Sequence, residues 1–173
     1  MRTKLLIVGL LSGTLTLAAC GGGGASATST SSGPTKAQYL AQSDAICKTT
    51  ETQLTPLVHQ VAGAAGAVFA GSPGAAAKVV PAAEQLHAVA AAGLAKLRAL
   101  TEPAADHARI AKFLTPLSSI VASIATAVSG IKKGQGTQAL AQLQADQTLA
   151  QQVTSAAKSY GLRQCETIFA ALG

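Results

Sequence analysis

The chain has 173 residues and a formal net charge of +6, from 13 Lys and Arg against 7 Asp and Glu. The basic residues are scattered, whereas a nucleic-acid-binding protein usually gathers them in a patch or stripe, so we expect no nucleic-acid partner. Aromatic residues make up 3% of the chain and Trp is absent, which disfavours a carbohydrate-stacking groove.

The first residues have the pattern of an export signal. Arg2 and Lys4 precede an apolar segment, residues 5–17, which small residues follow, as in secretory signals. The apolar segment has about 13 residues, fewer than the roughly 20 that a membrane-spanning helix needs. Residues 1–19 are therefore predicted to be a signal peptide that is removed, and we find no second long apolar run that would indicate a membrane domain.

The sequence at the end of this signal carries a specific motif. Leu17-Ala18-Ala19-Cys20 resembles the lipobox of bacterial lipoproteins. In that family diacylglycerol is added to the cysteine sulfur, and cleavage then makes this cysteine the first residue. The resemblance implies that Cys20 is lipidated, with acyl chains such as palmitate, and holds the protein to the extracytoplasmic face of the cell membrane. A secreted protein with a chance cysteine is the alternative.

Residues 21–35 form a low-complexity segment of Gly, Ser, Thr and Ala with a single Pro. Such a composition has nothing to bury and is typical of a flexible linker. Residues 20–35 are therefore interpreted as the lipidated cysteine and a tether, which would reach at most about 50 Å when extended. The remaining residues, 36–173, are predicted to form one domain.

Helical patterns fill this domain. Thr35 and Gln38 have capping-box spacing, which predicts a first helix from residue 35. Pro56 must either kink this helix or begin a new one. The segment 71–74 contains two Gly and one Pro and predicts a break. The apolar stripe of the first helix consists of Leu40, Cys47, Leu54, Leu57 and Val61.

A second helix is predicted from about residue 75 to residue 100, and Pro81 either kinks it or marks its true beginning. The third has the strongest periodicity: apolar residues recur every three or four positions from Ile110 to Ile131. We expect Thr101 to cap it and Pro116 to bend it.

A fourth helix is predicted from Thr137 to about residue 159, with Gly161 as a left-handed cap. A short fifth helix is predicted over 162–171. Ala and Leu, the strongest helix formers, dominate the domain, and no alternating pattern suggests a sheet. The sequence therefore predicts an all-α fold: an up-down four-helix bundle with kinked helices and a short C-terminal helix.

Two further cysteines, Cys47 and Cys165, lie near the two ends of this domain. In an exported protein an even pair is typical of a disulfide, and the first and last helices of an up-down bundle are neighbours. We predict one bridge between them, worth up to about 5 kcal/mol for a loop of about 120 residues. Two thiols that bind a metal or carry out redox chemistry are the alternative.

Residues 39–47 and 160–165 resemble the paired cysteine segments of small, uncharacterised actinobacterial lipoproteins. The resemblance implies that the two segments pack together, with Tyr39 and Tyr160 near the bridge. It implies no activity.

Residues that could carry chemistry are few. The ferritin-like Glu-x-x-His motif occurs once, at Glu84 and His87, whereas a di-iron bundle needs two such motifs and two further glutamates. His59 has no ligand partner at a suitable interval. Asp106 and His107 could join a serine in a triad, but no Gly-x-Ser-x-Gly turn is present. We therefore expect no metal, no cofactor and no enzymatic activity.

Two non-enzymatic functions are compatible with these patterns. The leading hypothesis is a binding or structural module that presents a helix face to another envelope protein. The alternative is a carrier that holds a small apolar ligand or lipid between its helices, in a cavity opened by the prolines. A continuous apolar cavity of roughly 300 Å³ or more would favour the carrier.

Overall fold

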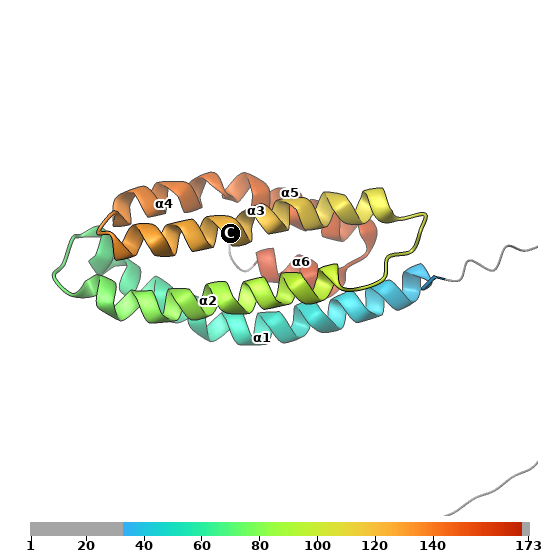
Figure 1. The fold of residues 1–173 in the computed structure, drawn as a ribbon, viewed down its shortest axis with the longest axis horizontal. Helices are drawn as coiled ribbons and strands as arrows, with labels where there is room; N and C mark the ends of the chain where they lie inside the picture. Colours follow the sequence, from blue (N-terminus) through green and yellow to red (C-terminus); the bar gives the residue numbers. More distant parts are fainter. Residues whose placement is uncertain (1–32, 171–173) are drawn as a thin grey trace, which may run out of the picture. The chain divides into compact units, whose positions relative to one another are not determined.

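The computed structural model describes residues 33–170 and shows an all-helical domain (Figure 1). The predicted signal peptide, the predicted lipidation site Cys20 and residues 21–32 of the predicted tether lie outside the described residues. So do the side chains at positions 69, 140, 143–145, 169 and 170. The helices are α1 (Lys36–Phe69), α2 (Ala75–Arg98), α3 (His107–Lys132), α4 (Gly136–Ala145), α5 (Gln147–Tyr160) and α6 (Arg163–Ala170).

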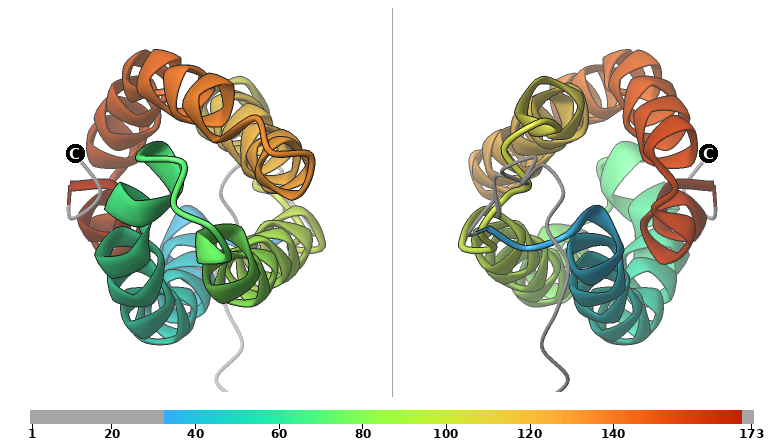
Figure 2. Two further views of the ribbon diagram at one scale, coloured as in Figure 1. Left: turned by 90° about the vertical axis from the view of Figure 1, so that its left-hand side faces the viewer. Right: turned by 90° about the vertical axis from the view of Figure 1, so that its right-hand side faces the viewer.

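Four long helical segments run up and down, as predicted, and the fourth of them is α4 followed by α5. Each of α1, α2 and α3 packs against the next, and α4 and α5 both pack against α3. The short helix α6 lies between α5 and α1 and contacts both, so that the helices form a ring in end view (Figure 2). The predicted bundle with a short C-terminal helix is confirmed.

The start of α1 is fixed by the predicted capping box. The Thr35 side chain accepts a hydrogen bond from the backbone N–H of Gln38 at 3.2 Å, and the Gln38 side chain accepts one from the Thr35 N–H at 2.9 Å. The helix continues through Pro56, so of the two alternatives left open at this proline, the start of a new helix does not occur. The Thr55 hydroxyl donates to the Glu51 carbonyl at 2.9 Å instead of capping a new helix.

The other helix boundaries differ in part from the sequence prediction. Helix α2 begins at Ala75 and includes Pro81, which therefore does not mark its beginning. Helix α3 begins at His107, not after Thr101, because the chain first makes a turn in which the Asp106 N–H donates to the Pro103 carbonyl at 2.9 Å.

The predicted fourth helix is two helices that are separated at Asp146. Its first residue is Gly136 rather than Thr137, and Gly136 lies directly against Val68 at the end of α1. A Cβ atom at position 136 would lie 2.8 Å from Val68 Cγ1, so any larger residue here would force Val68 or the helix to shift. At the other end Gly161, with φ of 102°, is the predicted left-handed cap.

The predicted disulfide joins Cys47 of α1 to Cys165 of α6, with a Cα–Cα distance of 5.0 Å. A second link lies one turn away, where the Asp44 carboxylate accepts a hydrogen bond from the Gln164 N–H at 2.9 Å. This N–H is one of the free donors in the first turn of α6, so Asp44 caps that helix from across the domain. These two links fix the C-terminal helix on the first one.

The hydrophobic core is divided into two clusters. The larger one surrounds the disulfide and includes the most deeply buried large side chains, among them Phe113, Ile110 and Leu162. The smaller one lies at the other end of the helices and has Val79, Ala83 and Val128 as its buried members. The unequal size of these clusters determines where the domain has space for a ligand.

Candidate functional site

A cavity of about 700 Å³ lies among the helices. Its volume is well above the roughly 300 Å³ at which a cavity becomes comparable to known ligand pockets. Most of its lining is apolar: Cys47, Leu54, Val58, Val61 and Ala62 of α1; Ala83, Leu86, Ala90, Gly93, Leu94 and Leu97 of α2; Phe113, Leu117, Ile120, Val121, Ile124, Ala127, Val128 and Ile131 of α3; Ala150 of α5; and Ile168 of α6.

Helix α3 forms the longest wall of this cavity. Its lining residues begin at Phe113 and end at Ile131. These two positions are 18 residues apart on a helix that rises 1.5 Å per residue, so the wall extends about 27 Å. The cavity is therefore elongated along the helices, a shape that suits an extended aliphatic chain better than a compact ring system.

The composition of α3 reflects this position. Over its most apolar 18 residues α3 has a mean hydropathy of 1.6, and a third of that window is buried. By length and composition alone, α3 is long and apolar enough to cross a membrane. The sequence analysis found no second long apolar run and so overlooked this helix. In the domain, its apolar side chains serve both the core, as Ile110 does, and the cavity wall, as Ile120 and Ile124 do.

The wall between α1 and α2 is closely packed. Gly93 of α2 faces Thr50 of α1 so closely that a Cβ at position 93 would lie 2.7 Å from Thr50 Oγ1. The Thr50 hydroxyl donates to the Ile46 carbonyl at 2.9 Å, so its hydrogen is already used within its own helix. The Thr50 hydroxyl therefore offers no free hydrogen to a molecule in the cavity.

The opposite side, between α1 and α5, is open. Four lining residues are exposed to solvent, namely Ala62 on α1 and Gln147, Gln151 and Ser155 on α5. Helix α6 separates α1 from α5 near the disulfide, and α4 meets the end of α1 at the other extreme. The exposed lining residues therefore place part of the cavity rim on the flank between α1 and α5.

Polar lining residues are concentrated on α5 and directly before it. Gln147, Gln151, Thr154 and Ser155 lie on α5, Asp146 precedes it and bonds to α3, and Thr50 is the one polar lining residue on the described part of the other walls. The cavity thus has a long apolar interior and one polar edge at its opening, which is the arrangement that an amphipathic molecule requires.

Asp146 is the buried member of this edge, with 8% of its surface exposed. Its Oδ1 accepts a hydrogen bond from the Ser123 hydroxyl of α3 at 3.2 Å. Its Oδ2 has no hydrogen-bond partner among the described residues and is shielded from solvent. A buried carboxylate oxygen without a donor is costly, but this oxygen lies inside the protein and not on the surface of the cavity.

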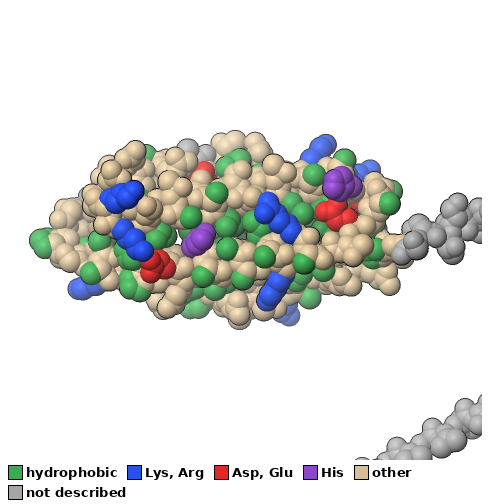
Figure 3. Space-filling view, viewed as in Figure 1, with side chains coloured by type: hydrophobic (Ala, Val, Ile, Leu, Met, Phe, Trp, Pro, Cys, Tyr) green, Lys and Arg blue, Asp and Glu red, His purple; other side chains and the backbone are tan. Residues whose placement is uncertain are grey.

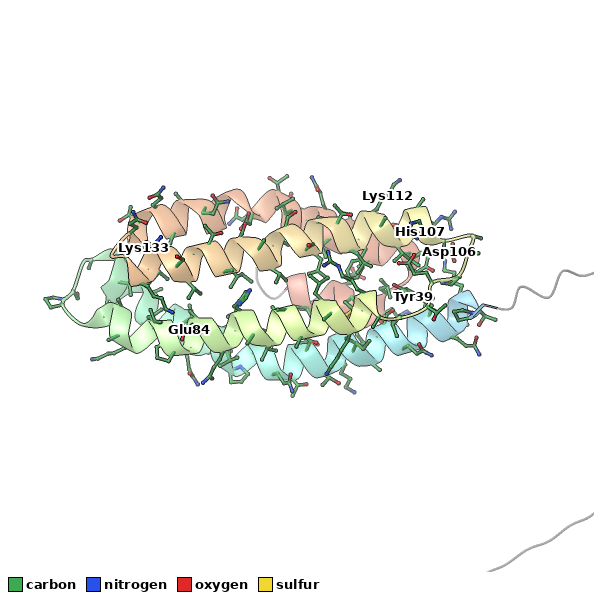
Figure 4. All side chains as sticks on the ribbon, viewed as in Figure 1. Tyr39, Glu84, Asp106, His107, Lys112 and Lys133 are labelled. Carbon is green, nitrogen blue, oxygen red and sulfur yellow. A yellow bond between two sulfur atoms is a disulfide. The ribbon has the colours of Figure 1, made fainter. Side chains whose placement is uncertain are left out.

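The residues singled out earlier for chemistry are not brought together. Glu84 forms an ion pair with Lys132, and His107 contacts Glu102 at 2.5 Å between Nδ1 and Oε2. Figure 4 shows His107 and Asp106 near Tyr39, at one end of the domain, and Glu84 far from them. Among the described residues, no group of three or more His, Cys, Asp and Glu side chains could hold a metal ion.

A second polar cluster lies near the disulfide. The Tyr160 hydroxyl donates to Asp106 Oδ2 at 3.0 Å, and the Tyr160 ring meets the Tyr39 ring edge to face at 6.1 Å between centroids. Burial raises the pKa of Tyr160 above its ordinary value of 10, the hydrogen bond to Asp106 raises it further, and burial likewise raises the pKa of Tyr39. Neither tyrosine lines the cavity, so this cluster fastens the ends of α1 and α5 together.

Comparisons with protein-family models, with curated proteins and with solved structures gave no significant match.

The sequence contained one signal for the polar edge that the sequence analysis did not use. Positions 146, 150, 153 and 157 recur at intervals of three and four, the spacing of one helix face. Val153 and Ala157 are fully buried and Ala150 lines the cavity. An aspartate in the same register is therefore an acidic group on an inner face, which is unusual for a filled core.

Proposed function

We propose that the helical domain binds a small apolar or amphipathic molecule, such as a single-chain lipid, in the cavity between its helices. The observation that carries this proposal is the apolar cavity of about 700 Å³ with one open, polar edge. This volume lies in the usual range of small-molecule sites, which are mostly apolar with a few placed polar groups.

The driving force would be the removal of apolar surface from water. Each Å² of apolar surface that a ligand buries contributes about 25 cal/mol. The side chains of α3 offer a continuous apolar wall for this purpose, and they come from a rigid helix rather than from a loop. Binding would therefore need little rearrangement of the backbone.

The proposal includes the membrane anchor. Leu17-Ala18-Ala19-Cys20 supports lipidation of Cys20, and the following tether would keep the cavity within about 50 Å of the membrane surface. A carrier held at this distance could take up and release lipid-like molecules without leaving the envelope. Replacing Cys20 with Ser should move the protein from the membrane fraction to the soluble fraction, and an unchanged membrane fraction would contradict the anchor.

We propose this role as a non-catalytic one, in which the protein holds and presents its ligand. The other expectation, a module that presents a helix face to an envelope protein, stays a prediction. The two differ in what the cavity does. A ligand carrier loses its function when the cavity is filled, whereas a surface that docks a protein partner does not.

Two measurements test ligand binding. Mass spectrometry of the natively purified protein should detect a co-purifying lipid or other apolar molecule. Titration calorimetry should then show that dodecanol binds the wild-type protein and binds an Ala150→Trp variant at least about tenfold more weakly, because the large side chain occupies the cavity.

Gln152→Trp is the matched control, since it adds the same side chain to the same helix at an exposed position that does not line the cavity. This variant should bind dodecanol as the wild type does. The proposal is wrong if no small molecule co-purifies and dodecanol does not bind the wild type. Equal binding by both Trp variants would place the site outside this cavity.

A further inference from the structure

The dimensions of the cavity point to the shape of its ligand. We propose, on the basis of the function proposed above, that the cavity holds one unbranched aliphatic chain of about 10–16 carbons at a time. A neutral, hydrogen-bonding head group would lie at α5, and the tail would extend toward Ile131. Molecules with two chains, a branch near the head group or a compact ring system would be excluded by their width.

The lining residues give the length of the cavity, and its volume then gives its width. The lining runs from Cys47 to Ala62 on α1, from Ala83 to Leu97 on α2 and from Phe113 to Ile131 on α3. At a rise of 1.5 Å per residue, these walls extend about 21–27 Å. A volume of about 700 Å³ over this length leaves a mean cross-section of roughly 26–33 Å².

This cross-section fits a single hydrocarbon chain. Because non-bonded carbon atoms approach to about 4.0–4.5 Å, one extended chain occupies roughly 20 Å². Two chains side by side would need about 40 Å², which is more than the cavity offers. The walls are helices rather than loops, so they cannot widen without a shift of the bundle.

The head group is placed by three exposed polar residues on α5. Gln147, Gln151 and Ser155 line the cavity and recur at intervals of four, so they form one stripe along the helix at the cavity rim. Amide and hydroxyl groups both donate and accept hydrogen bonds. These side chains are uncharged, so they match a neutral head group such as a hydroxyl, which would remain near water.

Two hydrogen bonds fix the level of this stripe along α3. The Ser123 hydroxyl donates at 3.2 Å to Asp146, the residue before α5, and the Tyr160 hydroxyl at the end of α5 donates at 3.0 Å to Asp106, the residue before α3. The two helices are therefore antiparallel. The start of α5 lies at the level of Ser123, about midway along the α3 wall.

The space for the tail lies beyond this level. From Ser123 to Ile131 α3 rises about 12 Å, and a head group at Gln151 would add about 7 Å. An extended chain advances about 1.25 Å per carbon, because its bonds of roughly 1.5 Å zigzag at the tetrahedral angle, so the tail has room for about 10–16 carbons.

The two hydrophobic clusters give the direction of the tail. The larger one fills the end around the disulfide, whereas the half that contains Ile131 holds the smaller one. The α3 side chains that line the cavity beyond Ser123 are all apolar. A tail that extends toward Ile131 therefore enters the less filled half and meets only apolar side chains on α3.

Three alcohols with twelve carbons each, the same head group and different shapes test this inference: dodecanol, 2-butyl-1-octanol and cyclododecanol. The protein is the whole mature chain from residue 20 with Cys20→Ser, studied without detergent so that nothing competes for the cavity. Titration calorimetry should give one bound dodecanol per chain, with an affinity at least about tenfold higher than for either isomer. From octanol through decanol to dodecanol the affinity should rise about fourfold per added carbon.

Val61→Phe tests the direction of the tail. Val61 lines the cavity on α1 and packs against the smaller cluster, so a larger side chain there shortens the space for the tail and leaves the head-group stripe untouched. It should weaken dodecanol binding at least about tenfold and octanol binding less than about threefold, because the shorter chain ends nearer α5. Gln60→Phe adds the same side chain at the neighbouring exposed position outside the cavity and should change neither affinity.

The outcomes separate this inference from the proposed function. If none of the alcohols binds the wild type, the proposed function is wrong and this inference is wrong with it. If the three isomers bind equally well, or a branched or cyclic isomer binds best, the cavity binds ligands but does not select an unbranched chain. If Val61→Phe weakens octanol as much as dodecanol, the tail does not extend toward Ile131. The comparison of isomers uses the unsubstituted cavity, so it decides the question of shape even if Val61→Phe does not fold.

Discussion

The two ends of the helical domain are built differently, although the same long helices form both. The end with the disulfide holds the larger hydrophobic cluster, an aromatic pair and the capping contact of Asp44. The opposite end holds a small cluster whose buried members are Val79, Ala83 and Val128. Large side chains and a covalent link thus fill one end, and the cavity extends from there toward the sparsely filled end.

Side-chain size explains this difference. Residues 61–68 of α1 consist of Ala, Gly and Val, and residues 75–83 of α2 consist of the short side chains Ala, Val and Pro with one Lys. Such side chains cannot reach the centre of a ring of helices. Figure 3 shows charged side chains spread over the visible face, its middle included, with hydrophobic ones along the helices between them. The comparison suggests that one end provides stability and leaves the remaining length free for binding.

The largest expected effect comes from opening the disulfide. A double Cys47→Ala, Cys165→Ala variant should lose about 2–5 kcal/mol of unfolding free energy, because the unfolded chain is no longer constrained over the 118-residue separation. Urea denaturation of the two proteins measures the loss. Treatment of the wild type with a reductant should give the same shift, and an unchanged midpoint in both experiments would contradict the view that this end stabilises the domain.

A matched pair of substitutions in α3 compares the two ends directly. Ile110 is 1% exposed in the large cluster, whereas Ile124 borders the cavity and is half-buried. Ile110→Ala should therefore cost about 2–5 kcal/mol, and Ile124→Ala less than about 1 kcal/mol, because the cavity side of Ile124 already lacks packing partners.

The same pair should behave in the opposite way toward a ligand. Ile124→Ala should weaken dodecanol binding severalfold, and Ile110→Ala should leave it unchanged wherever the protein is folded. Denaturation gives the unfolding free energy of each variant, and titration calorimetry gives the affinity of each for dodecanol. Equal stability losses at the two positions would show that the packing of the ends does not differ.

The sequence predicted the fold from strong, local signals. The capping box at Thr35, the three-four periodicity of α3 and the left-handed cap at Gly161 each depend on neighbouring residues, and each is present. The disulfide was also predictable, because the chain has one even pair of cysteines in its helical domain and an up-down topology brings the ends together.

The existence and size of the cavity could not be predicted, because they depend on the distances between helices. Whether small side chains leave a space depends on how far apart the helices lie, and that distance is set by contacts such as Gly93 with Thr50 and Gly136 with Val68. The start of α3 was wrongly predicted for a related reason. The turn before it is shaped by the long-range hydrogen bond from Tyr160 to Asp106, which no local pattern reveals.

Smaller effects than that of opening the disulfide are expected within the tyrosine pair at the disulfide end. Tyr160→Phe removes a donor from the buried Asp106 and should cost about 1–3 kcal/mol. Tyr39→Phe should be within about 0.5 kcal/mol of the wild type, because the buried Tyr39 hydroxyl has no well-formed hydrogen bond among the described residues and interacts only weakly with the Ser43 hydroxyl, which lowers its pKa slightly against the effect of burial. Denaturation of both variants measures the difference, and a larger loss for Tyr39→Phe would overturn the assignment of Tyr160 as the fastening residue.

The pH dependence of the unfolding free energy is a second test of the contribution of Tyr39 and Tyr160. Both tyrosines have a pKa that is raised above 10 in the folded protein. Their contribution is therefore fully present below pH 10 and is lost as the pH rises above it, because the unfolded chain ionises first. The loss should reach about 1 kcal/mol for Tyr160 within about one pH unit above 10, and Tyr39 should add a loss in the same direction. Each Phe variant should remove one tyrosine's share of the fall in unfolding free energy with pH. Since the chain has 2 Tyr, the double variant should show almost no tyrosine-linked loss. If its unfolding free energy still falls above pH 10, other groups cause the alkaline instability.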